Sequence, residues 1–514
     1  MAGHDPSHGT QRQLVKRKIS KHLSADLQEN LDSLHGMFDL CNDLISHSTN
    51  INHFSCCLIY LNDMVSREAM QRIETKLALG NDAISSQGDI SKFIYQRFAY
   101  SLLMEVNSLE TVSEHLLEGN AVLMVNEVES AFIFNTKADL GRHISTPETE
   151  QTVRGPKEGF VEDLQKNVMM IRKKLKTSAL KVENSTIGKQ SKTKISVIYI
   201  HGKASHEVVE EVHHRLSQIQ TDSILDSHYV ESMIKDQPRS PVPTVYSTER
   251  PDHVCGSLLD GKVAILVDGS PFALTVPALF VEFLHSSEDY YDGAFAATII
   301  RWIRFLGLFV TLILPAFYVA LVSFHQDLLQ SPFIIRIAAN REALPYPVLL
   351  EALFMYLTFE LLREAGLRMP KPFGGPIVTI LGLVLIGQAA VQAGIVGPIL
   401  AIVVSVTALT SFILPNYVFH QTIRFSGLPL LLLAGLFGFM GIIVGLMFGL
   451  TYLVSIRSFG TPYFFPVSPA RMERWKDVFV RAPWWAMDSR PIGFGTKSSS
   501  DTEAPSFKKE KDEI

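Results

Sequence analysis

Residues 377–414 form a continuous, largely apolar stretch without a charged side chain. As one helix it would measure roughly 57 Å, whereas a bilayer core is about 30 Å thick and needs about 20 apolar residues per crossing. The motif AGIVGP in its middle brings Gly394, Gly397 and Pro398, which weaken and then stop a helix. The pattern predicts a hairpin of two short membrane helices, near residues 377–393 and 397–414.

Two further apolar runs predict membrane spans near residues 299–323 and 428–455, within a transmembrane domain over residues 286–456. Arginines follow the last span, and the positive-inside rule places them in the cytoplasm. With a cytoplasmic N-terminal part, the number of crossings is then even. Four crossings are favoured, and five would result if the run 347–368 also spans.

The run 347–368 is apolar but carries charged residues, among them Glu351, Glu360 and Arg363. At 100° per residue Glu351 and Glu360 lie on opposite helix faces, so one of them would face lipid if the helix stood alone. The helix is therefore either interfacial or enclosed by partner helices. These three residues are candidates for gating or for buried charge.

The first 285 residues contain the short apolar runs and helical segments that are typical of a soluble α/β domain. They also contain an internal repeat. LLEGNAVLMVN at 116–126 matches LLDGKVAILVD at 258–268, and the strand-turn-helix pattern of 56–77 recurs at 196–219. Two matched pairs in the same order indicate internal duplication. Two related α/β subdomains are expected, and the complete division is a flexible arm (1–25), subdomain 1 (26–145), a linker with a basic helix (146–189), subdomain 2 (190–285), the transmembrane domain and a C-terminal segment with a disordered tail (457–514).

Two smaller features allow more than one interpretation. Arg172, Lys173, Lys174 and Lys176 form a basic patch on the linker helix, either a solvated face or a face near anionic lipid. The apolar segment 271–285 is too short to cross a membrane, and it predicts an interfacial position.

Composition excludes several functional classes. The net charge of −5 gives no basis for a nucleic-acid partner. Four cysteines without a CxxC pair argue against a disulfide framework and against a zinc site, and no cofactor is expected. Walker A, HExxH and GxSxG motifs are absent, so the chain is not expected to be an enzyme. The N-terminus lacks the apolar region of a secretory signal, which favours a cytoplasmic N-terminal domain.

Within the predicted hairpin, Gln388 and Gln392 share one helix face. Amides in hydrocarbon need partners, so this face either forms interhelical hydrogen bonds or lines a pore. Gly441, Gly445 and Gly449, four residues apart, make a groove that admits another helix.

Three carboxylates precede the first span: Glu288, Asp289 and Asp292. They are candidates for collecting cations at a pore mouth, and the simpler alternative is an ordinary helix cap and solvated turn.

Several long motifs resemble the A subunit of GerA-type spore germination receptors. They include TVRGPKEGF (152–160), TERPD (248–252), FELLREAGLRMPKP (359–372), IGQAAVQAGIVGP (386–398) and RSFGTPYFFPVSP (457–469). The resemblance covers nearly the whole chain, from about residue 50 to 490. It implies a multi-pass subunit of the spore inner membrane that works with a transporter-like B subunit, a C-subunit lipoprotein and membrane lipid.

The resemblance further implies a homo-oligomer of A subunits that forms an ion-conducting pore. The expected function is thus a germinant-receptor subunit that triggers spore germination through a gated cation pore. Two alternatives remain open at this point. One is a non-conducting scaffold that transmits binding by its partners, and the other is a transporter subunit, although paired broken helices in two repeated membrane halves are not evident.

Overall fold

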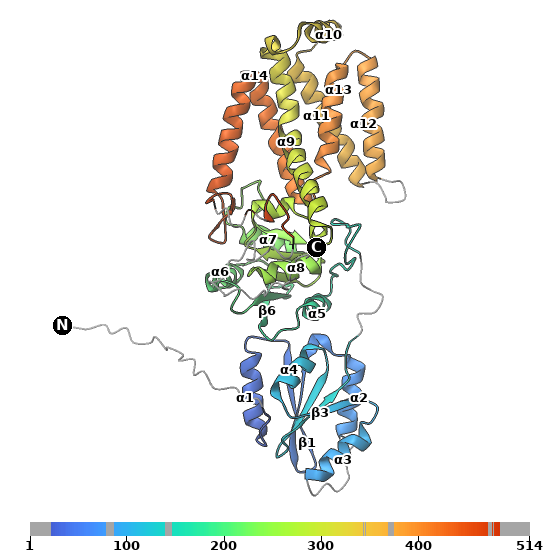
Figure 1. Cartoon of the computed structure of the whole chain (residues 1–514), viewed down its shortest axis with the longest axis vertical. Coiled ribbons are helices and arrows are strands. Elements are labelled where there is room, and N and C mark those ends of the chain that lie inside the picture. Colours follow the sequence, from blue (N-terminus) through green and yellow to red (C-terminus); the bar gives the residue numbers. More distant parts are fainter. Residues whose placement is uncertain are drawn as a thin grey trace, which may run out of the picture. The chain divides into compact units, whose positions relative to one another are not determined.

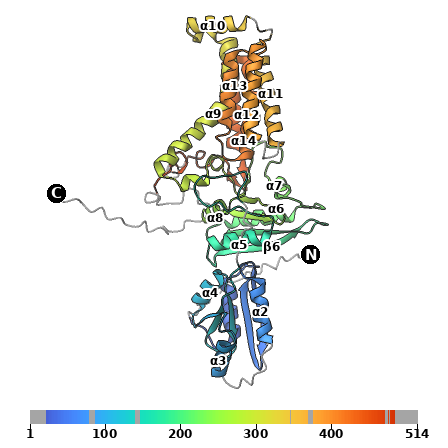
Figure 2. The ribbon, with the colours of Figure 1, turned by 90° about the vertical axis from the view of Figure 1, so that its right-hand side faces the viewer.

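The computed structural model describes residues 22–78, 87–138, 146–342, 344, 346–368, 375–470, 475 and 477–483. The chain forms two compact units, residues 1–141 with 172–183 and residues 142–171 with 184–514. The α/β structure comes first along the chain and a bundle of helices follows, as Figures 1 and 2 show.

The first unit contains a five-stranded sheet in the order β1-β2-β4-β5-β3. The neighbouring strands pair antiparallel. Side chains of α2 and α3 pack on one face with Cys56, Leu58 and Phe132, while α4 contacts the other face. The elements are α1 (Leu27–Met37), β1 (Leu44–Ile51), β2 (Phe54–Leu61), η1 (Asn62–Met64), α2 (Arg67–Ala78), α3 (Gln87–Arg97), β3 (Leu102–Val106), α4 (Leu109–Leu117), β4 (Ala121–Val125) and β5 (Ala131–Phe134).

A second five-stranded sheet has the order β6-β7-β9-β10-β8, which corresponds position by position to the first. The strands of both sheets are buried on both faces where the sequence is continuously apolar, as in VAILV of β9. The elements are α5 (Leu164–Lys174), β6 (Leu180–Ile187), β7 (Thr193–Ile200), α6 (His206–Ser217), α7 (Ser227–Ile234), β8 (Tyr246–Thr248), α8 (Pro251–Leu259), β9 (Val263–Val267), β10 (Ala273–Val276), η2 (Phe280–Leu284) and η3 (Ser287–Tyr290).

Two expectations for this part of the chain are corrected. Arg172 is fully buried and its guanidinium binds both carboxylate oxygens of Asp43 at 2.9 Å, so it does not belong to a surface patch; Lys173, Lys174 and Lys176 are exposed. Segment 271–285 is not an exposed interfacial stretch, because it forms β10 and the buried η2.

The helical bundle contains two helices long and apolar enough to cross a membrane among the described residues, α9 and α14. Pro398 occupies the first turn of α13, where its missing N–H costs nothing, and the motif AGIVGP separates α12 from α13. The elements are α9 (Ala294–Phe324), η4 (Gln326–Leu328), α10 (Ser331–Arg341), α11 (Val348–Arg368), α12 (Gly375–Gln392), α13 (Pro398–Ser411), α14 (Tyr417–Ser455), β11 (Arg457–Ser458) and β12 (Thr461–Pro462).

Helix α14 is two helices, because the chain reverses at Gly438 (φ 63°, ψ −142°). Near its start, Thr422 donates to the carbonyl of Pro241, and just past its end Ser458 donates to the carbonyl of Thr244. A straight helix would hold residues 422 and 458 about 54 Å apart. Positions 241 and 244 are three residues apart and at most about 11 Å from each other, so the two halves run back to back.

Candidate functional site

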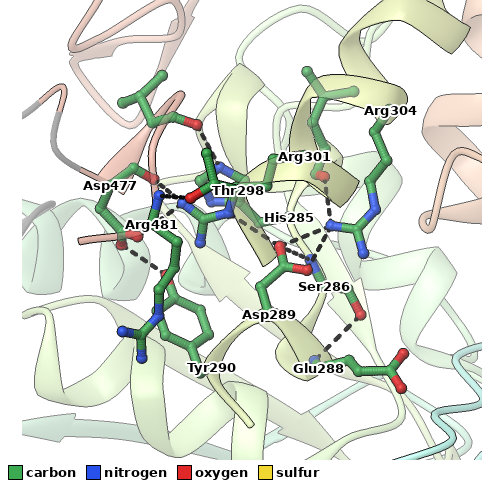
Figure 3. A network of polar contacts seen from close by, with 12 residues as sticks. His285, Ser286, Glu288, Asp289, Tyr290, Thr298, Arg301, Arg304, Asp477 and Arg481 are labelled. Atoms are coloured by element: carbon green, nitrogen blue, oxygen red, sulfur yellow. Dashed lines mark hydrogen bonds and ion pairs between the residues drawn. The ribbon is translucent and has the colours of Figure 1, made fainter. Parts of the chain in front are cut away.

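A buried network of charged and polar side chains lies at the base of α9, directly after η3 (Figure 3). Asp289, 2% exposed, accepts from Arg301 Nε at 3.1 Å and from Arg304 Nη1 at 2.7 and 2.8 Å. Both arginines are buried on the first turns of a helix that is otherwise apolar. Because a buried charge is tolerated only when it is paired, Asp289 is required for these arginines to enter the core.

A second carboxylate, Asp477, completes the network from the far end of the chain. It accepts from Arg301 Nη1 at 2.9 Å and from the hydroxyl of Tyr290 at 2.7 Å. Burial, together with the charge of Asp477, raises the pKa of Tyr290 well above its ordinary value, so the phenol remains a donor. The C-terminal segment is thereby fixed to the base of α9.

His285 makes a further link between η2 and this C-terminal segment. Its Nε2 lies 3.1 Å from the carbonyl oxygen of Val478 and must donate, since the carbonyl can only accept. Burial lowers the pKa of His285 well below its ordinary value, and the charges of Arg301 and Arg304 lower it further. The imidazole is therefore neutral and serves as a fixed structural donor.

Of the three carboxylates proposed for a pore mouth, the structure places Asp289 inside this ion network. Glu288 and Asp292 are half-buried beside it and bind segment 153–154, with Glu288 Oε1 accepting from the N–H groups of Val153 and Arg154 at 3.2 Å. All three carboxylates thus hold other parts of the chain.

The charged residues of α11 have partners on other helices. Glu351 binds Arg341 at 3.0 Å and accepts from the N–H of Gly397 at 3.3 Å, which ties α10 and the start of α13 to α11. Glu360 binds Arg424 of α14 at 2.8 Å. Each glutamate therefore pairs with an arginine of another helix and does not face lipid alone.

Arg363, also on α11, contacts the ring nitrogens of His420 at 2.7 and 3.1 Å and lies over the ring of Phe412. With the Glu360 pair, this contact fixes the lower half of α11 to the first turns of α14. Buried arginines beside aromatic rings gain a cation–π attraction.

The candidate glycines and glutamines of the membrane helices have different surroundings: two of the glycines are closely packed, and the other positions are open. A Cβ at Gly445 would lie 2.7 Å from Leu430 Cδ1, and one at Gly441 would collide with the carbonyl of Leu433. The helix that these two glycines admit is therefore the first half of α14 itself. A Cβ at Gly449 would meet nothing within 4 Å, and Gln388 and Gln392 are both exposed on α12.

The family of this chain follows from comparison with known proteins. A family model described as Bacillus/Clostridium GerA spore germination protein matches residues 32–492. The chain belongs to the GerA family. Spore germination protein A1 of Bacillus subtilis is 42% identical over 378 residues, covering 74% of this chain and 78% of that protein. Spore germination protein KA of the same species is 38% identical over 472 residues, covering 91% and 87%.

One further relative and one solved structure also match this chain. The uncharacterized membrane protein YfkQ of B. subtilis is 38% identical over 471 residues, which is 91% of both chains. The crystal structure of the N-terminal domain of the A subunit of the Bacillus megaterium spore germinant receptor GerK3 matches with 31% identity and a TM-score of 0.41, covering 51% of this chain and 99% of that domain. Membership among named spore germination proteins agrees with the exclusion of an enzyme.

Sequence reasoning on this GerA-family chain missed Asp477, His420 and Arg424 as partners. His420 and Arg424 carried a usable signal, because they are a histidine and the sole charged side chain within Tyr417–Ser455. Such residues in an apolar helix indicate a partner elsewhere. Asp477 carried no comparable signal in a polar C-terminal segment.

Proposed function

We propose that this chain is the membrane subunit of a nutrient germinant receptor, and that copies of it assemble into a gated cation-conducting pore in the spore inner membrane. A transporter-like B subunit and a C-subunit lipoprotein would be its partners. The observation that carries the pore is the exposure of Gln388 and Gln392 on one face of α12.

Two exposed amides four residues apart are costly in hydrocarbon, since each carries donors and acceptors that lipid cannot satisfy. In the described part of the chain α12 packs mainly against α11 and α13, and the two amides remain exposed. A second copy or a water-filled path would satisfy them. Either arrangement favours assembly around the hairpin.

We propose six crossings, made by α9, α11, α12, α13 and the two halves of α14. An even number returns the C-terminal segment to the side of the soluble units, where Ser458 contacts Thr244. Contact of Arg363 with His420 supports this arrangement, because it puts the end of α11 beside the start of α14. Arg363 and Arg368 then lie on the cytoplasmic side, as the positive-inside rule favours.

A flux measurement tests the pore. Cation efflux is recorded from liposomes that carry this subunit with its B and C partners, before and after addition of a defined mixture of amino acids, hexoses and purine ribonucleosides. The variant Gln388→Leu/Gln392→Leu should keep its assembly and change the rate or selectivity of the nutrient-dependent flux. Unchanged flux would move the conducting path away from α12. Absent flux in an assembled complex that binds nutrient would favour the non-conducting scaffold.

A pair of glycine variants tests the reversal of α14 within this function. Gly445→Leu places a large side chain against Leu430 and should separate the two halves, with loss of assembly and flux. Gly449→Leu is the matched control, because its surroundings are open. Equal behaviour of the two variants would contradict the back-to-back packing, whereas a defect at Gly449 alone would indicate a contact with another chain.

A further inference from the structure

Segment Glu148–Pro156, here called the strap, has no regular secondary structure and crosses from the edge of the second sheet to η3. Its first residues bind Glu249, whose Oε2 accepts from the N–H groups of Glu148 at 2.6 Å and Thr149 at 3.3 Å. Glu150 accepts from the hydroxyl of buried Thr248 at the end of β8. This half of the strap therefore covers the β8 edge.

Arg250, 2% exposed, holds the middle of the strap. Its Nη1 donates to the hydroxyl of Thr152 at 2.9 Å and to the carbonyl of Glu150 at 3.3 Å, and its Nη2 donates to the carbonyl of Pro156 at 3.0 Å. A planar guanidinium serves several acceptors at fixed angles, which an ammonium group cannot do. The strap is thus firmly bound on its sheet side.

The other side of the strap meets the residues directly before α9. Glu288 Oε1 accepts from the N–H groups of Val153 and Arg154, and Arg154 Nη1 lies 3.5 Å from Asp292. Gly155 (φ +116°) lies against the ring of Tyr291, where a Cβ would come within 2.5 Å of Cδ2. Only glycine fits this position, for both its backbone conformation and its space.

The two sides differ in strength. On the sheet side the partners Thr248 and Arg250 are buried. On the η3 side the Val153 side chain is 91% exposed, and Arg154 is 70% exposed. Exposed ion pairs contribute little, and the side chain of Val153 is not packed. The η3 side is therefore held more weakly than the sheet side.

We propose that the strap is a releasable clasp, which holds η3 and the base of α9 in the observed position and leaves η3 when the receptor responds to nutrient, while Arg250 retains the other half. This inference rests on the proposed receptor function. Because η3 carries Asp289, the carboxylate that pairs with Arg301 and Arg304, release of η3 reaches α9 directly.

Two trypsin sites within or beside the strap, Arg154 and Lys157, report its release without any substitution. The assembled receptor in membranes is treated with trypsin with and without the defined nutrient mixture. Since cleavage follows the population of the open segment, nutrient should speed cleavage at these sites about tenfold. Glu288→Ala, which removes the acceptor of two N–H groups, should give fast cleavage without nutrient, whereas Glu207→Ala on exposed α6 should not.

A reversible lock tests whether release is needed. The Cβ position at Gly155 lies 3.2 Å from Tyr291 Cγ, so the two Cβ atoms fall within about 4.7 Å, close to the span of a disulfide. Gly155→Cys/Tyr291→Cys is made in a Cys255→Ser background, with each single cysteine as control. Tyr291→Cys removes the ring clash, but the backbone conformation at position 155 still strains a cysteine there, so the reduced double variant should hold the strap weakly and keep its flux. The oxidised receptor should lose this flux and regain it on reduction.

The outcomes separate the two proposals. A wild-type complex that gives no nutrient response overturns the proposed function and the clasp with it. A wild-type complex that responds while cleavage at Arg154 and Lys157 stays constant, or an oxidised double-cysteine receptor that responds fully, overturns the clasp and leaves the receptor function standing.

Discussion

The two sheets share one strand order but treat one edge differently. In the first unit, edge strand β3 leaves Leu103 and Met104 exposed by 47% and 43%. In the second, the corresponding edge strand β8 buries Tyr246 and Thr248 and is covered by the strap. The same architecture therefore provides an open edge in one unit and a covered, polar junction in the other.

This difference shows that the second unit departs from a self-contained α/β fold at its edge strand β8. Strand β3 carries Glu105 and a register irregularity near Leu102, both of which discourage pairing with further strands. Strand β8 has neither feature, and the strap covers it instead. The residues after β8, Glu249 and Arg250, hold that cover, and Glu288 links it to η3 directly before α9.

The largest loss of stability is expected for a substitution in the ion network at the base of α9, and it is compared with a substitution on the open edge strand β3. Asp289→Ala leaves Arg301 and Arg304 buried without their carboxylate, and removing one partner of a buried ion pair costs about 3–5 kcal/mol. Glu105→Ala on exposed β3 should cost less than about 1 kcal/mol. Thermal unfolding of the detergent-solubilised receptor measures both. Equal destabilisation would remove the distinction between the two regions.

A second comparison concerns glycines. Gly155→Ala meets the Tyr291 ring and a strained backbone conformation, so the strap should be displaced at a cost of about 1–3 kcal/mol. Gly36→Ala in α1 has open space and helical conformation, and it should be neutral or stabilising by up to about 1 kcal/mol. Tryptic cleavage after Arg154 measures the strap and thermal unfolding measures both variants. Slow cleavage in Gly155→Ala would contradict the close contact.

Binding of the strap at the covered edge should depend on pH through Glu150. Glu150 is partly exposed as a residue, but burial of its carboxyl group raises its pKa from 4.5 to about 7. Because the folded pKa is the higher one, the protonated form favours strap binding. The contribution is complete below about pH 4.5 and is lost as pH rises through about 7. Strap cleavage should therefore increase about tenfold between pH 5.5 and 8.

The other titratable groups around Glu150 do not mask its titration in this pH range. Burial lowers the pKa of His253 to about 4, so it stays neutral. Burial raises the pKa of Asp252, but hydrogen bonds from Arg250 and Tyr291 outweigh that effect and leave it below its ordinary value. Arg250 remains charged, and Glu249 is the other carboxylate facing the site. Glu150→Gln should abolish the pH dependence, and a slope that persists in this variant would assign it to another group.

The smallest effect is expected at the open edge. Met104→Lys on β3 should change the free energy of unfolding by less than about 0.5 kcal/mol, because the side chain is exposed and charge is well tolerated on edge strands. Chemical denaturation of the full chain checks this value. A loss of nutrient response at unchanged stability would indicate that a partner covers β3 in the receptor.

Much of the local structure followed from the sequence. The apolar run of β2 lies within the predicted strand pattern. The AGIVGP motif lies between α12 and α13. The reversal at Gly438 was not predictable, since glycine is frequent in membrane helices and a single glycine in an apolar run does not distinguish a turn from a close contact.

The sequence by itself determined the local periodicity, the order of the elements, the repeated motifs and the GerA family, because each depends on residues near one another in the chain or on long ordered motifs. Only the tertiary structure decided which charges meet: Asp289 with Arg301, Glu360 with Arg424, and the strap with Arg250. These pairs join residues up to 100 positions apart. Their strength depends on distance and burial, which the packing of the elements sets and no local pattern records.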